Sequence, residues 1–418
     1  MTLKEFIRKN ETKVIDEEIP VNYRVTKEAK NQPKTPVYFP KFPNGPLLIN
    51  LWASRSRLAQ HFNIEKGQII EKLADAVDEP TRTKSVDSGG FEDRVEKTVD
   101  LTKLPIPKYY PKDGGRYITS GIVVAENDGV RNLSYHRMML RDENTFTIRI
   151  CPRHLKKIYD LAVDEKGHLD IAIVIGVNPA VLLASSTSID YEKDESEVAN
   201  SLLKSTLGEE VGMTEIENGI SVPADAEYVL QGRITADEDD EGPFVDITGT
   251  YDKVRQQPVV EVDKIYRRED AIFHALLPGG MEHFLLMGLP RESVLKKELS
   301  NITDVKDVRL TEGGCNWLHG VVSIKDKNTD IKQIIEKSFK AHTSMKKVTV
   351  VNDDIDIYDD KEVEWAIATR FQPDEDIYVY ENKKGSSLDP SAPHLTAKWG
   401  VDATRPWEGE EFERAEIE

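Results

Sequence analysis

The stretch Asn132-Leu133-Ser134-Tyr135-His136-Arg137, with the pair Arg153-His154 further along, decides how the fold is read. Both segments are predicted to be strands, and alternate residues of a strand share one face. Asn132, Ser134 and His136 therefore share a face. A core face is rarely built from Asn and Ser, so this face is expected to bind something polar. A metal ion and a phosphate are the natural candidates.

The region around this stretch reads as a series of short strands, from about residue 115 to residue 290. Turns such as Asn127-Asp128-Gly129 separate the strands, and one helix, about Glu195 to Thr206, interrupts them. Closely spaced strands with few helices indicate an antiparallel barrel or sandwich. On both sides of this region helices and strands alternate, which indicates α/β segments.

The chain is therefore predicted to have three parts. Residues 1–107 form an N-terminal α/β segment, residues 108–290 form the strand-rich domain, and residues 291–418 form a C-terminal α/β domain. The last of these ends in an acidic tail, Trp407 to Glu418, which is either loose or docks on a partner subunit to support oligomerisation.

Composition excludes several classes of protein. A net charge of −19 over 418 residues argues against nucleic acid as a partner, because Lys and Arg bind its phosphates. The two cysteines form no zinc or disulfide pattern and are typical of a reducing cytoplasm. The N-terminus lacks the apolar run of a signal peptide, and no window has the length of a membrane span. We expect a cytoplasmic protein without a membrane partner.

A first group of residues that indicates chemistry comprises Asn132, His154 and Glu195. An amide oxygen, an imidazole and a carboxylate together suit a manganese- or magnesium-type ion whose other ligands are phosphate oxygens. The spacing alone favours a plainer reading. A single His in a strand-rich domain is more often structural, and a Glu on a helix is usually solvated.

A second group comprises Arg137 and the segment Glu241-Gly242-Pro243-Phe244-Val245-Asp246. Gly-Pro makes a rigid turn between two acids, both of which are in reach of Arg137. Such a cluster separates the pKa values of its acids, so that one stays ionised and the other is available for proton transfer. The alternative is a hydrated acidic loop, which we accept for residues 237–240.

Two further segments are weaker indications of a ligand. Ala184-Ser185-Ser186-Thr187 follows an apolar run and is able to bind phosphate through hydroxyl and backbone N–H groups, although an ordinary loop is an equal alternative. Lys398 stands between Ala397 and Trp399 and is able to reach an anionic ligand. The usual alternative for such a residue is a surface lysine with a buried stem.

Taken together, these segments resemble the UbiD-type decarboxylases, which use prenylated FMN. The resemblance runs from Leu3 to Thr404, and its specificity comes from the joint order of several short motifs. They are Pro46–Leu58, Gly115–Thr119, Asn132–Arg137, Pro152–His154, Glu241–Asp246, Arg267–Ile272 and Lys398–Thr404.

The resemblance implies an α/β (α+β) fold in which a central split β-barrel binds the cofactor between N-terminal and C-terminal α/β segments. It implies that Arg137, Glu241 and Asp246 are the catalytic residues, and that Asn132, His154 and Glu195 hold a divalent metal, usually manganese, on the cofactor phosphate, with potassium nearby. The implied cofactor-binding residues are Thr119, Ser134, Arg153, Ser185, Ser186 and Lys398.

Two positions depart from the family pattern. Val245 stands where Gly is common before the last acid, and Arg153 stands where some members have Gln. Neither change removes a reacting group, but Arg153 is expected to alter how the cofactor is polarised.

The implied reaction is the loss of carbon dioxide from an α,β-unsaturated acid. Without a cofactor this loss leaves an unfavourable vinyl carbanion, and the flavin supplies an electron sink. Asp246 is the expected proton donor, and Arg137, charge-balanced by Glu241, is expected to hold the substrate carboxylate.

The length of the chain and its GSSLDPSA segment resemble archaeal family members that convert trans-anhydromevalonate 5-phosphate to isopentenyl phosphate for isoprenoid synthesis. A phosphorylated substrate requires basic groups, for which Arg55, Arg57, Lys112 and Arg116 are candidates. The alternative substrate is an aromatic acid of the 4-hydroxybenzoate or polyprenyl-hydroxybenzoate type.

The resemblance also implies that a flavin prenyltransferase supplies the cofactor and that the protein is a homo-oligomer. Two readings without turnover stay open: an inactive flavin-binding relative, and a protein that matures or stores the cofactor. An inactive relative is expected to have lost Arg137, Glu241 or Asp246, and all three are present.

Overall fold

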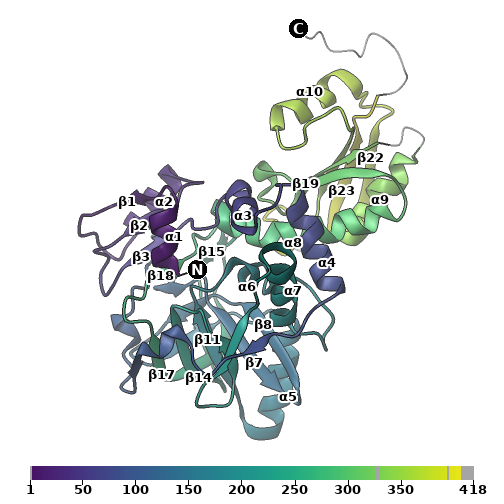
Figure 1. Cartoon of the computed structure of the whole chain (residues 1–418). Helices are drawn as coiled ribbons and strands as arrows, with labels where there is room; N and C mark the ends of the chain where they lie inside the picture. Colours follow the sequence, from purple (N-terminus) through teal and green to yellow (C-terminus); the bar gives the residue numbers. More distant parts are fainter. Residues whose placement is uncertain (1, 326–328, 393–394, 406–418) are drawn as a thin grey trace. The chain divides into compact units, whose positions relative to one another are not determined.

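The computed structural model describes residues 2–325, 329–392 and 395–405 (Figure 1). The chain divides into two compact units, Met1–Leu286 and Met287–Glu418. Within the described residues, no helix combines the length and apolar character that a membrane crossing requires. The acidic tail that we expect to support oligomerisation, Trp407 to Glu418, lies outside the described residues.

A small sheet in the first unit joins the two ends of that unit. Its strand order is β1 (Lys13–Val14), β2 (Val37–Phe39), β3 (Leu47–Ile49) and β18 (Phe273–Ala275). Strand β3 is fully buried, which is typical of a short, uninterrupted apolar strand covered on both faces. Because β18 pairs with β3 in parallel, the chain returns to the N-terminal segment after it has built the larger sheet.

The N-terminal segment that contributes to this small sheet also contains helices, and two of them begin with capping residues that the sequence displays. Helix α1 (Leu3–Lys9) begins with a capping box between Thr2 and Glu5. Ser54 caps helix α3 (Arg55–Phe62), as its sequence predicts. The remaining two are α2 (Arg24–Asn31) and α4 (Gln68–Asp78).

A larger antiparallel sheet forms most of the first unit. Its strands, in spatial order, are β6 (Tyr117–Ile118), β9 (Met138–Leu140), β10 (Thr145–Ile148), β17 (Arg255–Arg267), β14 (Tyr228–Glu241), β11 (His168–Ile175), β7 (Ile122–Asn127) and β8 (Val130–Tyr135), with β5 (Arg94–Glu96) also paired to β17. The closely spaced strands of the sequence predict this antiparallel arrangement.

Two hairpins of the larger sheet position polar residues. Strands β7 and β8 are joined by Asp128-Gly129, both with positive φ, which is the turn expected for an Asp-Gly pair. Strands β14 and β17 pair along most of their length, and the register places Glu241 opposite Arg255. The chain between these two residues contains the short strands β15 (Phe244–Val245) and β16 (Tyr251–Asp252).

Helices α5 (His154–Lys166), α6 (Pro179–Ala184) and α7 (Glu195–Leu207) connect strands of the larger sheet. The helix predicted near residues 195–206 is thus confirmed. The predicted strand at Arg153-His154 is wrong, because Arg153 immediately precedes α5 and His154 is the first residue of that helix. A third, three-stranded sheet contains β13 (Ser221–Pro223), β12 (Gly212–Glu215) and β4 (Lys84–Ser85).

The second unit has a mixed five-stranded sheet. Its order is β19 (Val305–Leu310), β20 (His319–Ile324), β21 (Lys347–Asn352), β23 (Leu395–Asp402) and β22 (Ile377–Lys384). Helices α9 (Ile331–Ala341) and α10 (Asp360–Arg370) belong to this unit, and α8 (Met281–Ser300) spans the boundary between the units. The whole chain therefore has the mixed α/β fold that the sequence predicts.

Candidate active site

One ion-pair network in the first unit joins residues that are far apart in the sequence. Arg137 lies between β8 and β9, Glu241 ends β14, Asp246 follows β15, and Asp252 ends β16. Gly242 has a φ of 104° directly after Glu241. Glycine adopts this conformation without strain, so the chain is able to turn sharply and bring the two later acids back toward Arg137.

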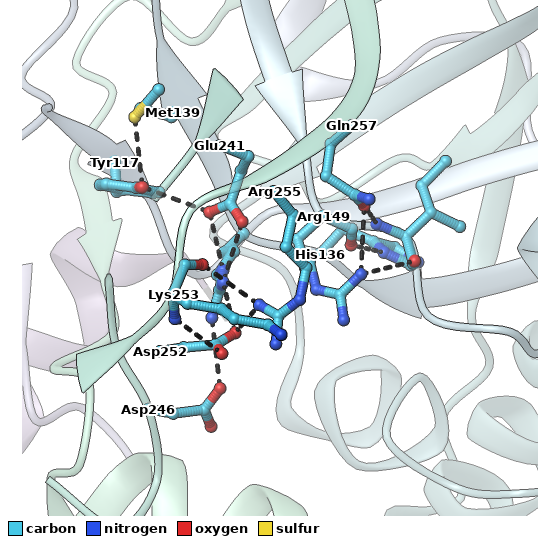
Figure 2. A network of polar contacts seen from close by, with 12 residues as sticks. Tyr117, His136, Met139, Arg149, Glu241, Asp246, Asp252, Lys253, Arg255 and Gln257 are labelled. Carbon is cyan, nitrogen blue, oxygen red and sulfur yellow. Dashed lines mark hydrogen bonds and ion pairs between the residues drawn. The ribbon is translucent and has the colours of Figure 1, made fainter. Parts of the chain in front are cut away.

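Three carboxylates accept hydrogen bonds from Arg137 (Figure 2 shows them converging). Nε and Nη2 each donate to one oxygen of Glu241, both at 2.9 Å. Nη1 donates to Oδ2 of Asp246 at 3.2 Å, and Nη2 also donates to Oδ2 of Asp252 at 3.0 Å. The paired bonds to Glu241 are the fork geometry that fixes a guanidinium most firmly.

The network is largely removed from solvent. The Glu241 side chain is fully buried, and that of Arg137 is 10% exposed. Burial lowers the pKa of Arg137, but the bonded carboxylates raise it more, so its pKa lies above the ordinary value. The guanidinium lies 4.7 Å from the ring centroid of Phe244, and the Tyr117 hydroxyl donates to Glu241 at 3.2 Å. Arg137 is thus a fixed cation.

Sequence reasoning did not find Asp252 or its partner Arg255. Oδ2 of Asp252 accepts from Nη1 of Arg255 as well as from Arg137. Burial raises the pKa of Asp252, but the two guanidinium groups lower it more, to about 2. The available signal was the register of the β14–β17 hairpin, which sets Arg255 opposite Glu241. Hairpin register is not readable from residue spacing alone.

His283, in the first turn of α8, faces the same network. Burial lowers its pKa, the charge of Asp246 raises it, and the charge of Arg137 lowers it, with a net decrease. The imidazole is therefore neutral at neutral pH. Its Nδ1 accepts from the backbone N–H of Gly279 at 3.1 Å, so the neutral ring carries its proton on Nε2. His283 is a hydrogen-bond donor beside the acids rather than a second cation.

A second polar cluster lies where β8 meets α7. Nδ2 of Asn132 donates to Glu195 at 2.8 Å, and the Leu133 N–H donates to the other oxygen of Glu195 at 2.9 Å. The Ser134 hydroxyl donates to Oδ1 of Asn132 at 2.7 Å and lies 3.0 Å from Nε2 of His136. The predicted shared face of Asn132, Ser134 and His136 is thus confirmed.

Glu195 is a buried carboxylate whose two partners are both uncharged. Its residue is 3% exposed. Burial is the main reason that its pKa is raised, to about 8. A buried carboxylate in this condition gains from a nearby cation, so the residues fit a metal ion. The side-chain oxygens of Asn132 and Glu195 are both of the kind that manganese and magnesium accept.

The third predicted metal ligand, His154, is not bonded to this pair in the described structure. Its ring packs edge-on against Tyr191, with centroids 5.6 Å apart, and nearby cations contribute to a lowered pKa whose main cause is burial. No group of three or more His, Cys, Asp or Glu side chains close enough to hold a metal occurs among the described residues. The structure brings Asn132 and Glu195 together, and the role of His154 stays a prediction.

The predicted cofactor-binding residues of the first unit differ in their surroundings. The Ser185 hydroxyl is buried and has no hydrogen-bond partner in the part of the chain that the structure describes, whereas Ser186 donates to the carbonyl of Leu183 at 2.8 Å. Thr119 bonds Tyr109 at 2.7 Å and accepts from a backbone N–H, and Arg153 is exposed. The free hydroxyl of Ser185 therefore fits a ligand best.

Lys398 lies in the second unit, on β23. It is 3% exposed, and its Nζ donates to the carbonyl of Thr343 at 2.5 Å. Burial is the main cause of its lowered pKa, about 8. Lys398 is thus a buried amine rather than the solvated surface lysine of the alternative reading.

Two of the four basic residues considered as ligands of a substrate phosphate donate hydrogen bonds to backbone carbonyl groups instead. Arg116 donates to the carbonyls of Ile106 and Leu104, both at 2.7 Å, and to a third carbonyl. Arg57 donates to the carbonyls of Leu51 and Lys34. These contacts give both guanidinium groups a structural role.

Family models match nearly the whole chain. The 3-octaprenyl-4-hydroxybenzoate carboxy-lyase (UbiD) N-terminal domain matches residues 3–77, the Rift-related domain matches residues 83–281, and the C-terminal domain matches residues 284–403. The chain therefore belongs to the UbiD family of carboxy-lyases.

Curated relatives cover the full length. The chain is 46% identical to the anhydromevalonate phosphate decarboxylase of Methanocaldococcus jannaschii, over 99% of each chain. It is 42% identical to the enzyme of the same name from Methanosarcina mazei, over 100% of this chain and 99% of the relative.

Solved structures of the same class have the same fold. The UbiD-class enzyme HmfF from Pelotomaculum thermopropionicum in complex with FMN superimposes with a TM-score of 0.95 at 34% identity, over 99% of this chain and 97% of that one. An evolved dimeric form of HmfF in complex with prFMN gives a TM-score of 0.91 at 32% identity, over 100% and 97% of the two chains.

Proposed function

We propose that this protein decarboxylates trans-anhydromevalonate 5-phosphate to isopentenyl phosphate and carbon dioxide, with prenylated FMN as cofactor. The full-length relatives at 42–46% identity carry the substrate assignment, since both are anhydromevalonate phosphate decarboxylases. The network around Arg137 supports the reaction, because it offers one fixed cation and several carboxyl groups beside one another.

Arg137 is proposed to bind the substrate carboxylate. Glu241 is fully buried and accepts hydrogen bonds from Arg137 through both oxygens. It therefore neutralises the guanidinium charge and holds the group in place. A fixed donor orients the carboxylate and removes the cost of positioning it during the reaction.

Asp246 is proposed to donate the proton to the carbon that loses carbon dioxide. Its side chain is 22% exposed, against 0% for Glu241, and its contact at 3.2 Å is the longest of the hydrogen bonds that Arg137 donates to the three acids. Asp246 is therefore the acid that reaches a ligand most easily. When bound, prenylated FMN supplies the electron sink for the bond that breaks.

The cofactor phosphate and its metal are assigned to the second polar cluster. Ser185, whose hydroxyl has no hydrogen-bond partner in the described residues, would bond the phosphate. The resemblance to the family also implies Thr119, Ser134, Arg153, Ser186 and Lys398 as cofactor-binding residues. Asn132, His154 and Glu195 would hold manganese, with potassium nearby. The metal would anchor the phosphate and would not serve to activate water. The observation that supports this assignment is the buried carboxyl group of Glu195, which lies against the side chain of Asn132.

The proposal includes two partners. A flavin prenyltransferase would supply the cofactor, and the protein would work as a homo-oligomer. Co-expression with a flavin prenyltransferase is the direct test of the first, and light scattering of the purified protein is the test of the second.

The reaction is tested with purified protein that was loaded with prenylated FMN. Incubation with trans-anhydromevalonate 5-phosphate should give isopentenyl phosphate by mass spectrometry, and protein loaded with FMN alone should give none. 4-Hydroxybenzoate is assayed in parallel. Turnover of the aromatic acid without turnover of the phosphorylated acid would contradict the proposed substrate and favour an aromatic-acid decarboxylase.

A further inference from the structure

The hydrogen bonds of Arg137 leave little room for a substrate carboxylate. Nε has one N–H, and Nη1 and Nη2 have two each. Glu241 takes the Nε–Nη2 edge, Asp252 takes the second N–H of Nη2, and Asp246 takes one N–H of Nη1. A carboxylate that approaches the Nη1–Nη2 edge with both oxygens must therefore displace one of the protein's own acids.

Asp252 is the acid best able to give way. Glu241 is fully buried, and Arg137 is the only guanidinium to which a hydrogen bond links it in the described residues. Asp246 likewise has one guanidinium partner there. Asp252 differs, because its Oδ2 is shared between Arg137 and Arg255. When Nη2 of Arg137 binds another carboxylate in place of Asp252, Asp252 keeps Arg255 as its counter-charge.

The surroundings of Asp252 allow this exchange. The side chain of Asp252 is 18% exposed and that of Arg255 is 28% exposed, so both lie nearer to solvent than Glu241. The other oxygen of Asp252 accepts from the N–H of Lys253 at 2.9 Å, which holds the carboxylate beside Arg255. Figure 2 shows Asp252 between Glu241 and Asp246, with Arg255 beside it.

We propose that Asp252 competes with the substrate carboxylate for Nη2 of Arg137, and that Arg255 sets the strength of this competition by holding Asp252. Asp252 and Arg255 are then positioning residues that tune substrate affinity. This inference rests on the proposed role of Arg137 as the carboxylate-binding residue.

The competition predicts opposite effects for two substitutions. Asp252→Asn weakens the internal competitor, so a ligand carboxylate should bind about threefold to tenfold more tightly, the range that one net hydrogen bond provides. Arg255→Leu leaves Asp252 to Arg137 alone, so the same ligand should bind more weakly by a similar factor. Calorimetric titration of holoprotein with the saturated analogue 3-methyl-5-phosphopentanoate measures this without turnover.

Two controls separate competition from a general change of charge. Isopentenyl phosphate has a phosphate but no carboxylate, so its affinity should be the same in the wild type and both variants. Asp239→Asn removes a carboxylate from β14, the strand that Glu241 ends, where Asp239 pairs with Arg141. This variant should bind the saturated analogue as the wild type does. Thermal unfolding of each variant checks that the fold is intact.

The outcomes distinguish this inference from the function on which it rests. Opposite shifts for the saturated analogue alone, with isopentenyl phosphate unaffected, support it. Shifts in the same direction, no shift, or equal shifts for both ligands overturn it while wild-type turnover still stands. A wild-type protein that neither binds the saturated analogue nor releases carbon dioxide overturns the proposed function itself.

Discussion

Removal of the Arg137 guanidinium should destabilise the first unit strongly, and a second substitution should recover part of the loss. In Arg137→Met, Glu241 stays fully buried with the Tyr117 hydroxyl as its remaining side-chain partner among the described residues. Loss of one partner of a buried ion pair costs about 3–5 kcal/mol.

The double variant Arg137→Met/Glu241→Gln also removes the negative charge of Glu241, which Arg137→Met leaves without a cation. Gln keeps the shape of Glu241 and an oxygen that accepts from Tyr117, so its unfolding free energy should exceed that of Arg137→Met by about 1–3 kcal/mol, the size of a coupling between contacting residues. Asp246 and Asp252 also lose a partner in both variants, so this loss cancels in the comparison.

Urea unfolding of flavin-free protein, followed by circular dichroism and tryptophan fluorescence, measures these differences. The matched control is Arg141→Met, which removes a guanidinium from a more exposed pair with Asp239 and should cost less than about 1 kcal/mol. The reasoning is refuted if Arg137→Met is as mild as this control, or if Glu241→Gln adds to the loss instead of reducing it.

Three further outcomes are expected. Manganese should raise the thermal midpoint of wild-type holoprotein but not that of Glu195→Gln, and equal increases in both would contradict the metal assignment. Ser185→Ala should unfold at the wild-type temperature yet retain less flavin after dialysis, since the Ser185 hydroxyl has no partner among the described residues; unchanged retention would contradict that role. Asp354 bonds Arg370 and Arg405, and although burial raises its pKa, these guanidinium groups lower it to about 2. Its contribution, about 1 kcal/mol because solvent screens a partly exposed pair, is thus fully present above pH 4 and lost as pH falls through 2. The stability difference between wild type and Asp354→Asn should shrink over that range, and a constant difference would exclude the ion pairs as its cause.

Local signals in the sequence were sufficient for much of the fold. The Asp128-Gly129 turn and the alternation after it fixed the shared face of Asn132 and Ser134, because strand geometry alone decides which residues face the same way. The helix predicted at about Glu195 to Thr206 is α7 in the structure. These features depend on residues that are close together in the sequence, so a single sequence is enough to predict them.

One local signal was read wrongly. Leu155, Ile158, Tyr159 and Ala162 follow helical spacing and are buried, and Gly167 ends the helix with a positive φ. A strand at His154 is therefore the wrong prediction, since this spacing indicates the helix that the structure has. The error matters for the site, because the first residue of a helix points its side chain differently from a strand residue.

The partners of Arg137 show where the sequence no longer suffices. The resemblance to the UbiD family placed Arg137, Glu241 and Asp246 together, and the structure joins them by hydrogen bonds. Asp252 lies beside Arg137 because the long strands β14 and β17 pair and the chain between them folds back. Such contacts depend on the hairpin register and on which charges share a buried volume, and one sequence does not display either.

The most direct test of the central claim is decarboxylation of trans-anhydromevalonate 5-phosphate in deuterated water by prenylated-FMN-loaded protein. We predict isopentenyl phosphate with one deuterium on the carbon that lost carbon dioxide, formed by the wild type and lost or strongly slowed in Arg137→Met and Asp246→Asn. Wild-type rates in both variants, or no carbon dioxide from the loaded wild type, would contradict the account.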